Sequence, residues 1–171
     1  NARVLIQGIL FILLVANLAW QALLLAQEGS IPAVLGLESR EEYLAEHNDP
    51  PYRAIRFINQ FPPGSRVLFS GNGQSYYVTT DHVADVNHSN WGHLVYQWGD
   101  EPEQIRRALA AQGFTHIFYS GYDFTWQLNF DFDGSLAREL TVFDEFAARC
   151  ATLVYDEGED GQVYALLDQC R

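Results

Sequence analysis

The sequence predicts one N-terminal transmembrane helix, followed by a three-layer α/β (Rossmann-like) domain with a C-terminal antiparallel hairpin. Residues 4–26 form an apolar stretch of 23 residues without a charge. The remaining residues alternate between segments of helical periodicity and short apolar segments with strand character. This order is typical of helices packed on a sheet. We therefore divide the chain into a transmembrane helix (1–28), a linker with a capped helix (29–50) and an extracytoplasmic α/β domain (51–171).

The apolar stretch is long enough to cross a membrane. As a helix, its 23 residues rise about 34 Å, which exceeds the thickness of a hydrocarbon core. The apolar core of a secretory signal peptide is shorter, about 7–15 residues, and ends at a small-residue cleavage site. No clean site of that kind follows residue 26, so we expect a span that is not cleaved. The sequence begins at Asn1 rather than Met, and we expect a processed chain or, preferably, the last span of a multi-pass protein.

The charges that flank the span predict its orientation. Arg3 precedes it and Glu28 is the first charge after it. Because basic flanks stay in the cytoplasm, the α/β domain is expected on the periplasmic or extracellular side. The chain has two cysteines, Cys150 and Cys170. In an exported domain such a pair most simply forms a disulfide, worth about 3 kcal/mol for a loop of about 20 residues. The alternative is two free thiols in a reducing compartment.

The composition narrows the class of partners. The formal net charge is −12, from 22 acidic and 10 basic residues. An acidic domain repels phosphate backbones, so nucleic acid is excluded as a partner. No polybasic segment for anionic lipid headgroups is present. With 48% hydrophobic and 14% aromatic residues, the part after the span can bury the core of one domain.

The N-terminal half of the domain is predicted as two helices and short strands. Ser39 and Glu42 form a capping box that begins a helix ending near His47. The prolines of residues 49–51 interrupt it, and residues 52–61 resume as a helix with an apolar face. Residues 62–64 (PPG) stop this helix, and 66–70 (RVLFS) form a buried strand. Further extended pieces are expected at residues 76–79 and 82–86.

The C-terminal half repeats the alternation. Asp100 is expected to cap a helix that Gly113 ends in a left-handed conformation. A strand follows at residues 115–120, and residues 135–149 form an amphipathic helix. Residues 151–155 and 162–167 are then expected to pair as the terminal hairpin across a polar turn at 156–161.

Several segments together resemble a family of membrane enzymes. They are the apolar span, ESREEYL (38–44), PYRAIRFINQFPPGSRVLFSGNGQSYYV (51–78), IRRALAAQGFTHIFYS (105–120) and GQVYALL (161–167). In this order they are similar to the C-terminal end of polyprenyl-phosphate-sugar-dependent membrane glycosyltransferases, the superfamily of protein O-mannosyltransferases and lipid A aminoarabinose transferases. The resemblance covers most of the chain, but it lies in structure and spacing rather than in a catalytic signature.

The resemblance implies a role without chemistry for this part of the protein. Members of that superfamily carry their acidic catalytic residues in an early extracytoplasmic loop, and no residue of this chain matches that loop. We therefore expect no catalytic and no cofactor-binding residue here, in a parent polypeptide that transfers sugar from a lipid-phosphate carrier. The implied partners are membrane lipid, other transmembrane helices and a lipid-linked sugar or glycan acceptor.

A second hypothesis belongs to another class of protein. The chain can instead be a single-span accessory subunit of a larger membrane assembly, such as an energy-converting complex, with a structural or docking role. Gln7, Asn17 and Gln21 lie inside the span, and such side chains favour hydrogen bonds between helices over exposure to lipid. Both hypotheses accommodate them.

Two groups of residues have the composition of metal sites. Asn129, Asp131 and Asp133 precede Gly134 as in the first half of a calcium loop, but the bidentate Glu is displaced, because Leu140 occupies its position. Helix capping by Asp133 or Ser135 is the preferred interpretation. His82, Asp85, His88 and His93 offer zinc ligands in a polar loop without regular spacing. Solvated or hydrogen-bonding histidines are preferred there, and no resident metal or cofactor is expected in this chain.

The remaining candidates are a glycine turn and an aromatic segment. The turn at Gly71 and Gly73 lacks the third glycine and the helix of a dinucleotide loop, so a tight turn is expected. Residues 91–132 are rich in aromatic side chains, which suit packing at a membrane or partner, stacking on sugar rings, or an ordinary core. The candidates for partner or acceptor contact are Trp91, Trp98, Tyr122 and Trp126.

Overall fold

The computed structural model describes residues 2–47, 51–85, 89–129, 131–158 and 161–171. The predictions that include residues 49, 50, 86, 88, 130, 159 or 160 fall in part outside these ranges. The chain divides into two compact units, Asn1–Asp49 and Pro50–Arg171.

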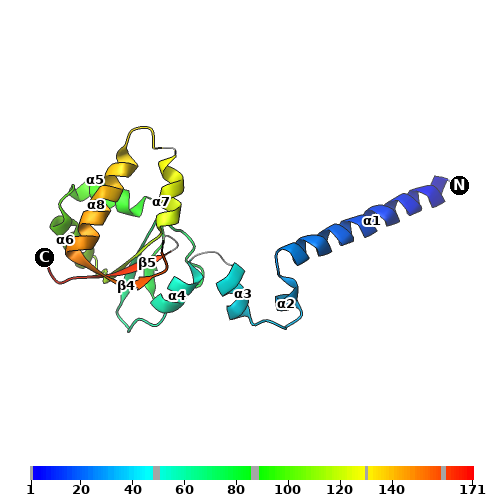
Figure 1. Cartoon of the computed structure of the whole chain (residues 1–171), viewed down its shortest axis with the longest axis horizontal. Coiled ribbons are helices and arrows are strands. Elements are labelled where there is room, and N and C mark those ends of the chain that lie inside the picture. The colour runs from blue at the N-terminus through cyan, green and yellow to red at the C-terminus, as the bar shows by residue number, and fades with distance from the viewer. Residues whose placement is uncertain (1, 48–50, 86–88, 130, 159–160) are drawn as a thin grey trace. The chain divides into compact units, whose positions relative to one another are not determined.

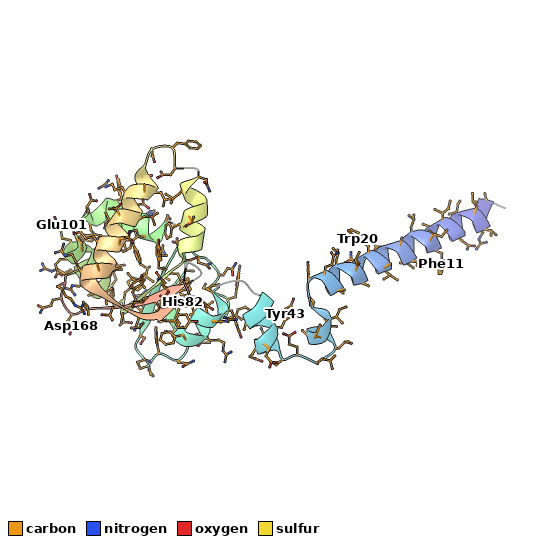
Figure 2. The ribbon with its side chains drawn as sticks, in the orientation of Figure 1. Phe11, Trp20, Tyr43, His82, Glu101 and Asp168 are labelled. Atoms are coloured by element: carbon orange, nitrogen blue, oxygen red, sulfur yellow. A yellow bond between two sulfur atoms is a disulfide. The ribbon has the colours of Figure 1, made fainter. Side chains whose placement is uncertain are left out.

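The first unit is helical. Its main element, α1 (Ala2–Gln27), is long and apolar enough to cross a membrane, and none of its described side chains is buried. Figure 2 shows Phe11 and Trp20 projecting outward from this helix. A single turn, α2 (Ile31–Val34), lies within the segment expected to be a linker. The helix after it, α3 (Arg40–His47), begins at the predicted site.

The predicted capping box of α3 is confirmed. The backbone N–H of Glu42 donates to Oγ of Ser39 (3.1 Å), and the backbone N–H of Ser39 donates to a carboxylate oxygen of Glu42 (2.9 Å). The hydrogen bond from the Ser39 backbone lowers the pKa of Glu42, since it stabilises the charged form.

The second unit is built on a mixed sheet of five strands in the order β2-β1-β3-β5-β4. β1 (Arg66–Ser70) pairs in parallel with β2 (Asp81–Val83) and with β3 (His116–Tyr119). β5 (Gln162–Leu166) runs antiparallel to both β3 and β4 (Ala151–Asp156). The expectation of an α/β arrangement after an apolar helix is thus confirmed in its coarse form.

Helices cover both faces of the sheet (Figure 1). One hydrophobic cluster joins the sheet to α5 (Asn90–Trp98), α6 (Pro102–Ala111), α7 (Gly121–Leu128) and α8 (Ser135–Cys150). The other joins it to α4 (Tyr52–Ile58). The alternation along β1 explains the division, because Val67 and Phe69 face α4 whereas Leu68 belongs to the larger cluster.

The C-terminal residues are fastened to α8. Cys150 and Cys170 form a disulfide, as predicted. The backbone N–H of Leu167 donates to the carbonyl of Cys150, and that of Arg171 donates to the carbonyl of Arg149, each at 2.9 Å. These contacts hold residues 167–171 against the end of the helix.

Two local predictions are wrong, and a third is confirmed only in part. Residues 76–77 form a turn and 78–79 join no strand, because the Asn59 side chain bonds their backbone, donating to the Tyr77 carbonyl (2.8 Å) and accepting from the Thr79 N–H (2.7 Å). The extended piece expected at 82–86 is present as β2, which begins at residue 81 and ends at residue 83. The residue before α6 is Glu101 rather than Asp100, whose carboxylate instead pairs with Arg138 (2.5 Å).

Candidate functional site

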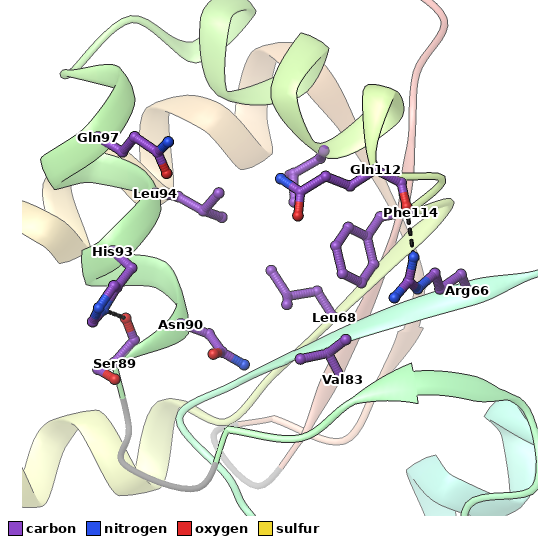
Figure 3. Close-up of a pocket in the computed structure, with 11 residues that line it drawn as sticks. Arg66, Leu68, Val83, Ser89, Asn90, His93, Leu94, Gln97, Gln112 and Phe114 are labelled. Atoms are coloured by element: carbon purple, nitrogen blue, oxygen red, sulfur yellow. Dashed lines mark hydrogen bonds between the residues drawn. The ribbon is translucent and has the colours of Figure 1, made fainter.

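A cleft of about 420 Å³ opens between α5, the end of α6 and the strand pair β1–β2 (Figure 3). Small-molecule sites in proteins measure about 300–1,000 Å³, so the cleft can hold a ligand of one or two rings. Its lining separates into an apolar floor and a polar rim.

The floor of the cleft is an uncovered part of the larger hydrophobic cluster. Leu68 comes from β1, Val83 from β2 and Leu94 from α5, and Leu109 and Phe114 complete the floor from α6 and the segment after it. Leu68, Leu94 and Phe114 keep 5–8% of their surface exposed, whereas Leu109 keeps none. The floor therefore offers apolar contact to a bound molecule at little further cost of desolvation.

The rim of the cleft carries amide, imidazole and hydroxyl groups. Asn90, His93 and Gln97 lie at spacings of three and four residues and so share one face of α5, with Ser89 just before the helix. Gln112 follows α6 on the other side. Figure 3 shows the carboxamides of Gln97 and Gln112 reaching over the cavity from opposite walls.

The one guanidinium on the described lining is engaged within the fold. Nη1 of Arg66 donates to the carbonyl of Gln112 (2.7 Å), and its Nε lies 3.4 Å from a carboxylate oxygen of Asp81. The guanidinium also lies 4.8 Å from the centre of the Phe114 ring, in the range of a cation–π contact. Arg66 therefore forms part of the wall of the cleft, and Asp81 partly balances its positive charge.

The described side chains that line the cleft include no carboxylate and no thiol. General acid–base catalysis needs a proton donor and acceptor within reach of one reacting group. The described lining carries one imidazole, that of His93, and no carboxylate pair of the kind used for sugar transfer.

A second polar group lies at the carboxyl ends of the parallel strands, where α/β folds often bind ligands. Ser70, Asn72, Asp85 and Ser120 are all buried there. Asp85 is 1% exposed, and its carboxylate accepts three backbone N–H groups, from Gly71 (2.9 Å), Ser89 (2.7 Å) and Asn90 (3.1 Å). This carboxylate ties the end of β1 to the start of α5, a structural role.

The glycine turn after β1 is confirmed as a tight turn. Gly71 has φ +86°, and a Cβ at this position would lie 2.7 Å from the Phe124 ring and 2.8 Å from the Ser120 carbonyl oxygen. No dinucleotide-type helix follows in this part of the described chain.

The proposed zinc ligands are used elsewhere. The Asp85 carboxylate binds backbone N–H groups, and Nδ1 of His82 bonds to the Thr80 carbonyl (2.9 Å). Nδ1 of His93 bonds to the Ser89 carbonyl (3.1 Å) on a helix rather than in the predicted loop. His88 lies outside the described residues. The interpretation as hydrogen-bonding histidines accounts for His82 and His93.

The proposed calcium ligands serve the start of α8. The Asp133 carboxylate accepts the backbone N–H of Ser135 (3.0 Å), and that of Asp131 accepts the backbone N–H of Ala137 (2.9 Å). The Ser135 hydrogen bonds lower the pKa of Asp133. Asn129 is exposed. The N-cap residue of α8 is Gly134, with no side-chain cap, so the prediction of Asp133 or Ser135 at that position is wrong. The carboxylates of Asp131 and Asp133 instead bond backbone N–H groups in the first turn of the helix.

The aromatic residues predicted to contact a partner or acceptor differ in how exposed their side chains are. Trp91 is 1% exposed, its ring packs edge-on against Phe143 and Phe146, and its Nε1 donates to the Glu139 carbonyl. It is a core residue, so its assignment to a contact surface is wrong. Trp98 is 39% exposed and stays a candidate. The side chains of Tyr122 and Trp126 lie outside the described part of the structure.

Among the described residues, one group of potential metal ligands comes together, Glu103 with Cys150 and Cys170. The two sulfur atoms are joined in the disulfide. The Glu103 carboxylate is bonded to Arg106 and Arg107 and accepts the backbone N–H of Cys170 (3.2 Å). Arg106 above all lowers the pKa of Glu103 to about 2. These three side chains hold the C-terminal residues in place. Their potential metal-ligating atoms are already used in the disulfide and in the hydrogen bonds of the Glu103 carboxylate.

The chain matches no protein-family model, no curated protein and no solved structure. Any functional conclusion therefore depends on the geometry of the cleft itself.

The carboxamides of the cleft were not predicted from the sequence. Residues 82–93 were expected to form a polar loop, and α5 was not expected. A signal was present, because Trp91, Leu94 and Val95 follow the i, i+3, i+4 pattern of a helix and are all buried. That pattern places Asn90 and Gln97 on one face of the helix beside Leu94, and so could have indicated the rim.

Proposed function

We propose that this chain is the non-catalytic C-terminal region of a membrane glycosyltransferase that uses a lipid-phosphate-linked sugar donor. In this proposal α1 spans the membrane, and the α/β unit lies on the periplasmic or extracellular side. We also propose that this unit is a three-layer, Rossmann-like domain closed by a hairpin of β4 and β5. The two hydrophobic clusters on opposite faces of the sheet support that description.

One observation carries the functional proposal. An apolar helix with no buried described residue is joined to an α/β unit whose open cleft is lined by uncharged hydrogen-bonding groups and no described carboxylate. Such a site favours holding a neutral polar molecule at a membrane surface over breaking a glycosidic bond, which normally takes two carboxylates. The chemistry is then supplied elsewhere in the parent enzyme.

The side of the membrane is tested by labelling. Tyr96 and Phe132 are each 94% exposed, so Tyr96→Cys and Phe132→Cys place a reactive thiol on the surface without disturbing the core. We expect a membrane-impermeant maleimide to label both variants in intact cells. Labelling only after permeabilisation would contradict the proposed orientation.

The enzymatic role is tested by depletion. Membranes from cells with and without the chain are given a radiolabelled polyprenyl-phosphate sugar, and transfer to endogenous acceptors is counted. We expect transfer to fall with depletion and to return with the wild-type chain. Equal transfer in both membranes would reject a glycosyltransferase role.

The second candidate function, an accessory subunit of a larger membrane assembly, is favoured by one feature of α1. Gln7, Asn17 and Gln21 lie on this helix, and at 100° per residue they fall within an arc of about 80°. Three carboxamides on one face favour pairing with a polar face of another helix. Co-purification of unrelated subunits in mild detergent, lost on replacing all three by Leu, would favour this function.

A further inference from the structure

The hydrogen bonds of the rim determine which way two of its carboxamides point. Nδ2 of Asn90 donates to the carbonyls of Phe69 (2.9 Å) and Ala84 (3.2 Å), and Nε2 of Gln112 donates to the carbonyl of Ala108 (3.3 Å). A carbonyl oxygen only accepts, so the nitrogen must face it in each case. Oδ1 of Asn90 and Oε1 of Gln112 have no partner among the described residues, and both are therefore available as acceptors.

Two further groups on α5 extend the same pattern. Nδ1 of His93 bonds to the Ser89 carbonyl and therefore donates, and in the tautomer with its proton on Nδ1 the Nε2 atom is an acceptor. Gln97 is exposed and makes no hydrogen bond with a described residue, so it offers both a donor and an acceptor. Among the described residues, the rim thus offers free acceptors on Asn90, Gln112, His93 and Gln97, together with free N–H donors on the carboxamides of Gln97 and Gln112.

The charges around the cleft exclude most charged ligands. Nη1 of Arg66 donates to the Gln112 carbonyl, and Asp81 lies 3.4 Å from Nε, so the positive charge at this edge of the cleft is partly balanced. The acceptor atoms and the net charge of −12 disfavour an anion. A cation would need carboxylates, and the described lining has none. Neutral groups that both donate and accept hydrogen bonds are the ligand groups that remain.

From these groups we infer that the cleft binds a neutral, hydroxyl-rich ring, with the chemistry of a single uncharged sugar. Its hydroxyls would donate to Asn90, Gln112 and His93, and one apolar ring face would rest on Leu94 and Phe114. Gln97 would exchange a donor and an acceptor with a neighbouring hydroxyl pair. This assignment rests on the proposed function, which places a neutral polar molecule in the cleft, and names the chemical class of that molecule.

The test titrates the full chain in lipid nanodiscs, because glycoside detergents would compete for the site. The probe is methyl α-glucopyranoside, and the matched anion is methyl α-glucopyranosiduronate, which differs from it only in the carboxylate at C6. The side-chain amide resonances of Gln97 and Gln112 report binding by NMR. We expect saturation by the neutral sugar with a Kd of roughly 1 mM, and weaker binding of the anion.

Variants separate the cleft from the rest of the surface. Gln97→Leu and Gln112→Leu each remove an acceptor and should raise the Kd about fivefold. Gln60→Leu is the control, since this exposed glutamine lies on the α4 side, outside the cleft. Circular dichroism checks that each variant is folded.

Three results together support the inference. The neutral sugar binds saturably, at least one of the two cleft variants binds it more weakly, and the control variant binds it as the wild type does. Failure to saturate by about 100 mM, binding unaltered in both cleft variants, or equal binding of the anionic sugar overturns it. A chain that binds the sugar but is dispensable for transfer would retain this inference and reject the proposed function.

Discussion

Replacing Asp85 by Ala should destabilise the α/β unit far more than the loss of an exposed carboxylate. The side chain is 1% exposed and accepts backbone N–H groups from Gly71, Ser89 and Asn90 at 2.7–3.1 Å. Alanine cannot accept a hydrogen bond, so all three donors lose their partner. Each unsatisfied buried donor costs about 1–3 kcal/mol.

The expected loss is about 3–5 kcal/mol, because the N–H groups of Ser89 and Asn90 are only partly buried and take the lower value. A domain of this size is stable by about 5–15 kcal/mol, so the loss is a large fraction of the total. With a urea dependence of about 2 kcal/mol per molar, the unfolding midpoint should fall by about 2 M.

The assay is urea unfolding of the full chain in nanodiscs, followed by the fluorescence of the buried Trp91. Asp81→Ala is the matched control, because its carboxylate pairs with Arg66 at 3.4 Å and is 69% exposed. Its loss should cost less than about 1 kcal/mol. Amide exchange at Gly71 and Ser89 should also speed up in the Asp85 variant. Equal midpoints for the two variants, with unchanged exchange, would refute the reasoning.

Three further changes probe other parts of the unit. In urea unfolding, Gly71→Ala should lower the free energy of unfolding by at least about 2 kcal/mol, because the new Cβ would overlap the Phe124 ring. Gly113→Ala is the control, since Gly113 has a similar φ but open space around it, and should lower the free energy of unfolding by about 1 kcal/mol. Replacing Cys150 and Cys170 together by Ser removes a disulfide that joins residues 20 positions apart, and should lower the free energy of unfolding by about 3 kcal/mol. Thermal unfolding should show a lower midpoint for this variant than for the oxidised wild type. Because the pKa of Glu103 falls from 4.5 to about 2 on folding, its contribution to stability is complete above pH 4.5 and is lost as the pH falls towards 2. Glu103→Gln should therefore flatten the pH dependence of the urea midpoint in that window, and an unchanged acid limb would contradict the assigned pairing with arginine.

The elements that were predicted correctly are those with a local signal in the sequence. The capping box at Ser39, the long uncharged and mainly apolar run of α1, and the apolar strand β1 can each be recognised from one short segment of sequence. α5 was missed because Gly92 and the preceding polar residues weaken a helix of nine residues. The strand expected at residues 76–79 failed because the Asn59 side chain, distant in sequence, takes its backbone hydrogen bonds.

The candidate site was less accessible to prediction from the sequence, for a geometric reason. Gln97 and Gln112 are ordinary surface glutamines until α5 and α6 pack on the sheet and bring them to opposite walls of one cleft. Trp91 shows the opposite error, since an aromatic residue in a polar context proved to belong to the core. Burial depends on tertiary packing, and composition alone did not resolve it.

β5, the last of the five strands in chain order, occupies an interior place in the sheet. β5 lies between β3 and β4, so neither of these has its full set of backbone partners until residues 162–166 have joined them. The sheet therefore cannot close until this segment has left the ribosome, and the Cys150–Cys170 link can form only after that. Ending the polypeptide before residue 162 would leave two strands with open edges, which makes that truncation a route to aggregation rather than to a smaller stable domain.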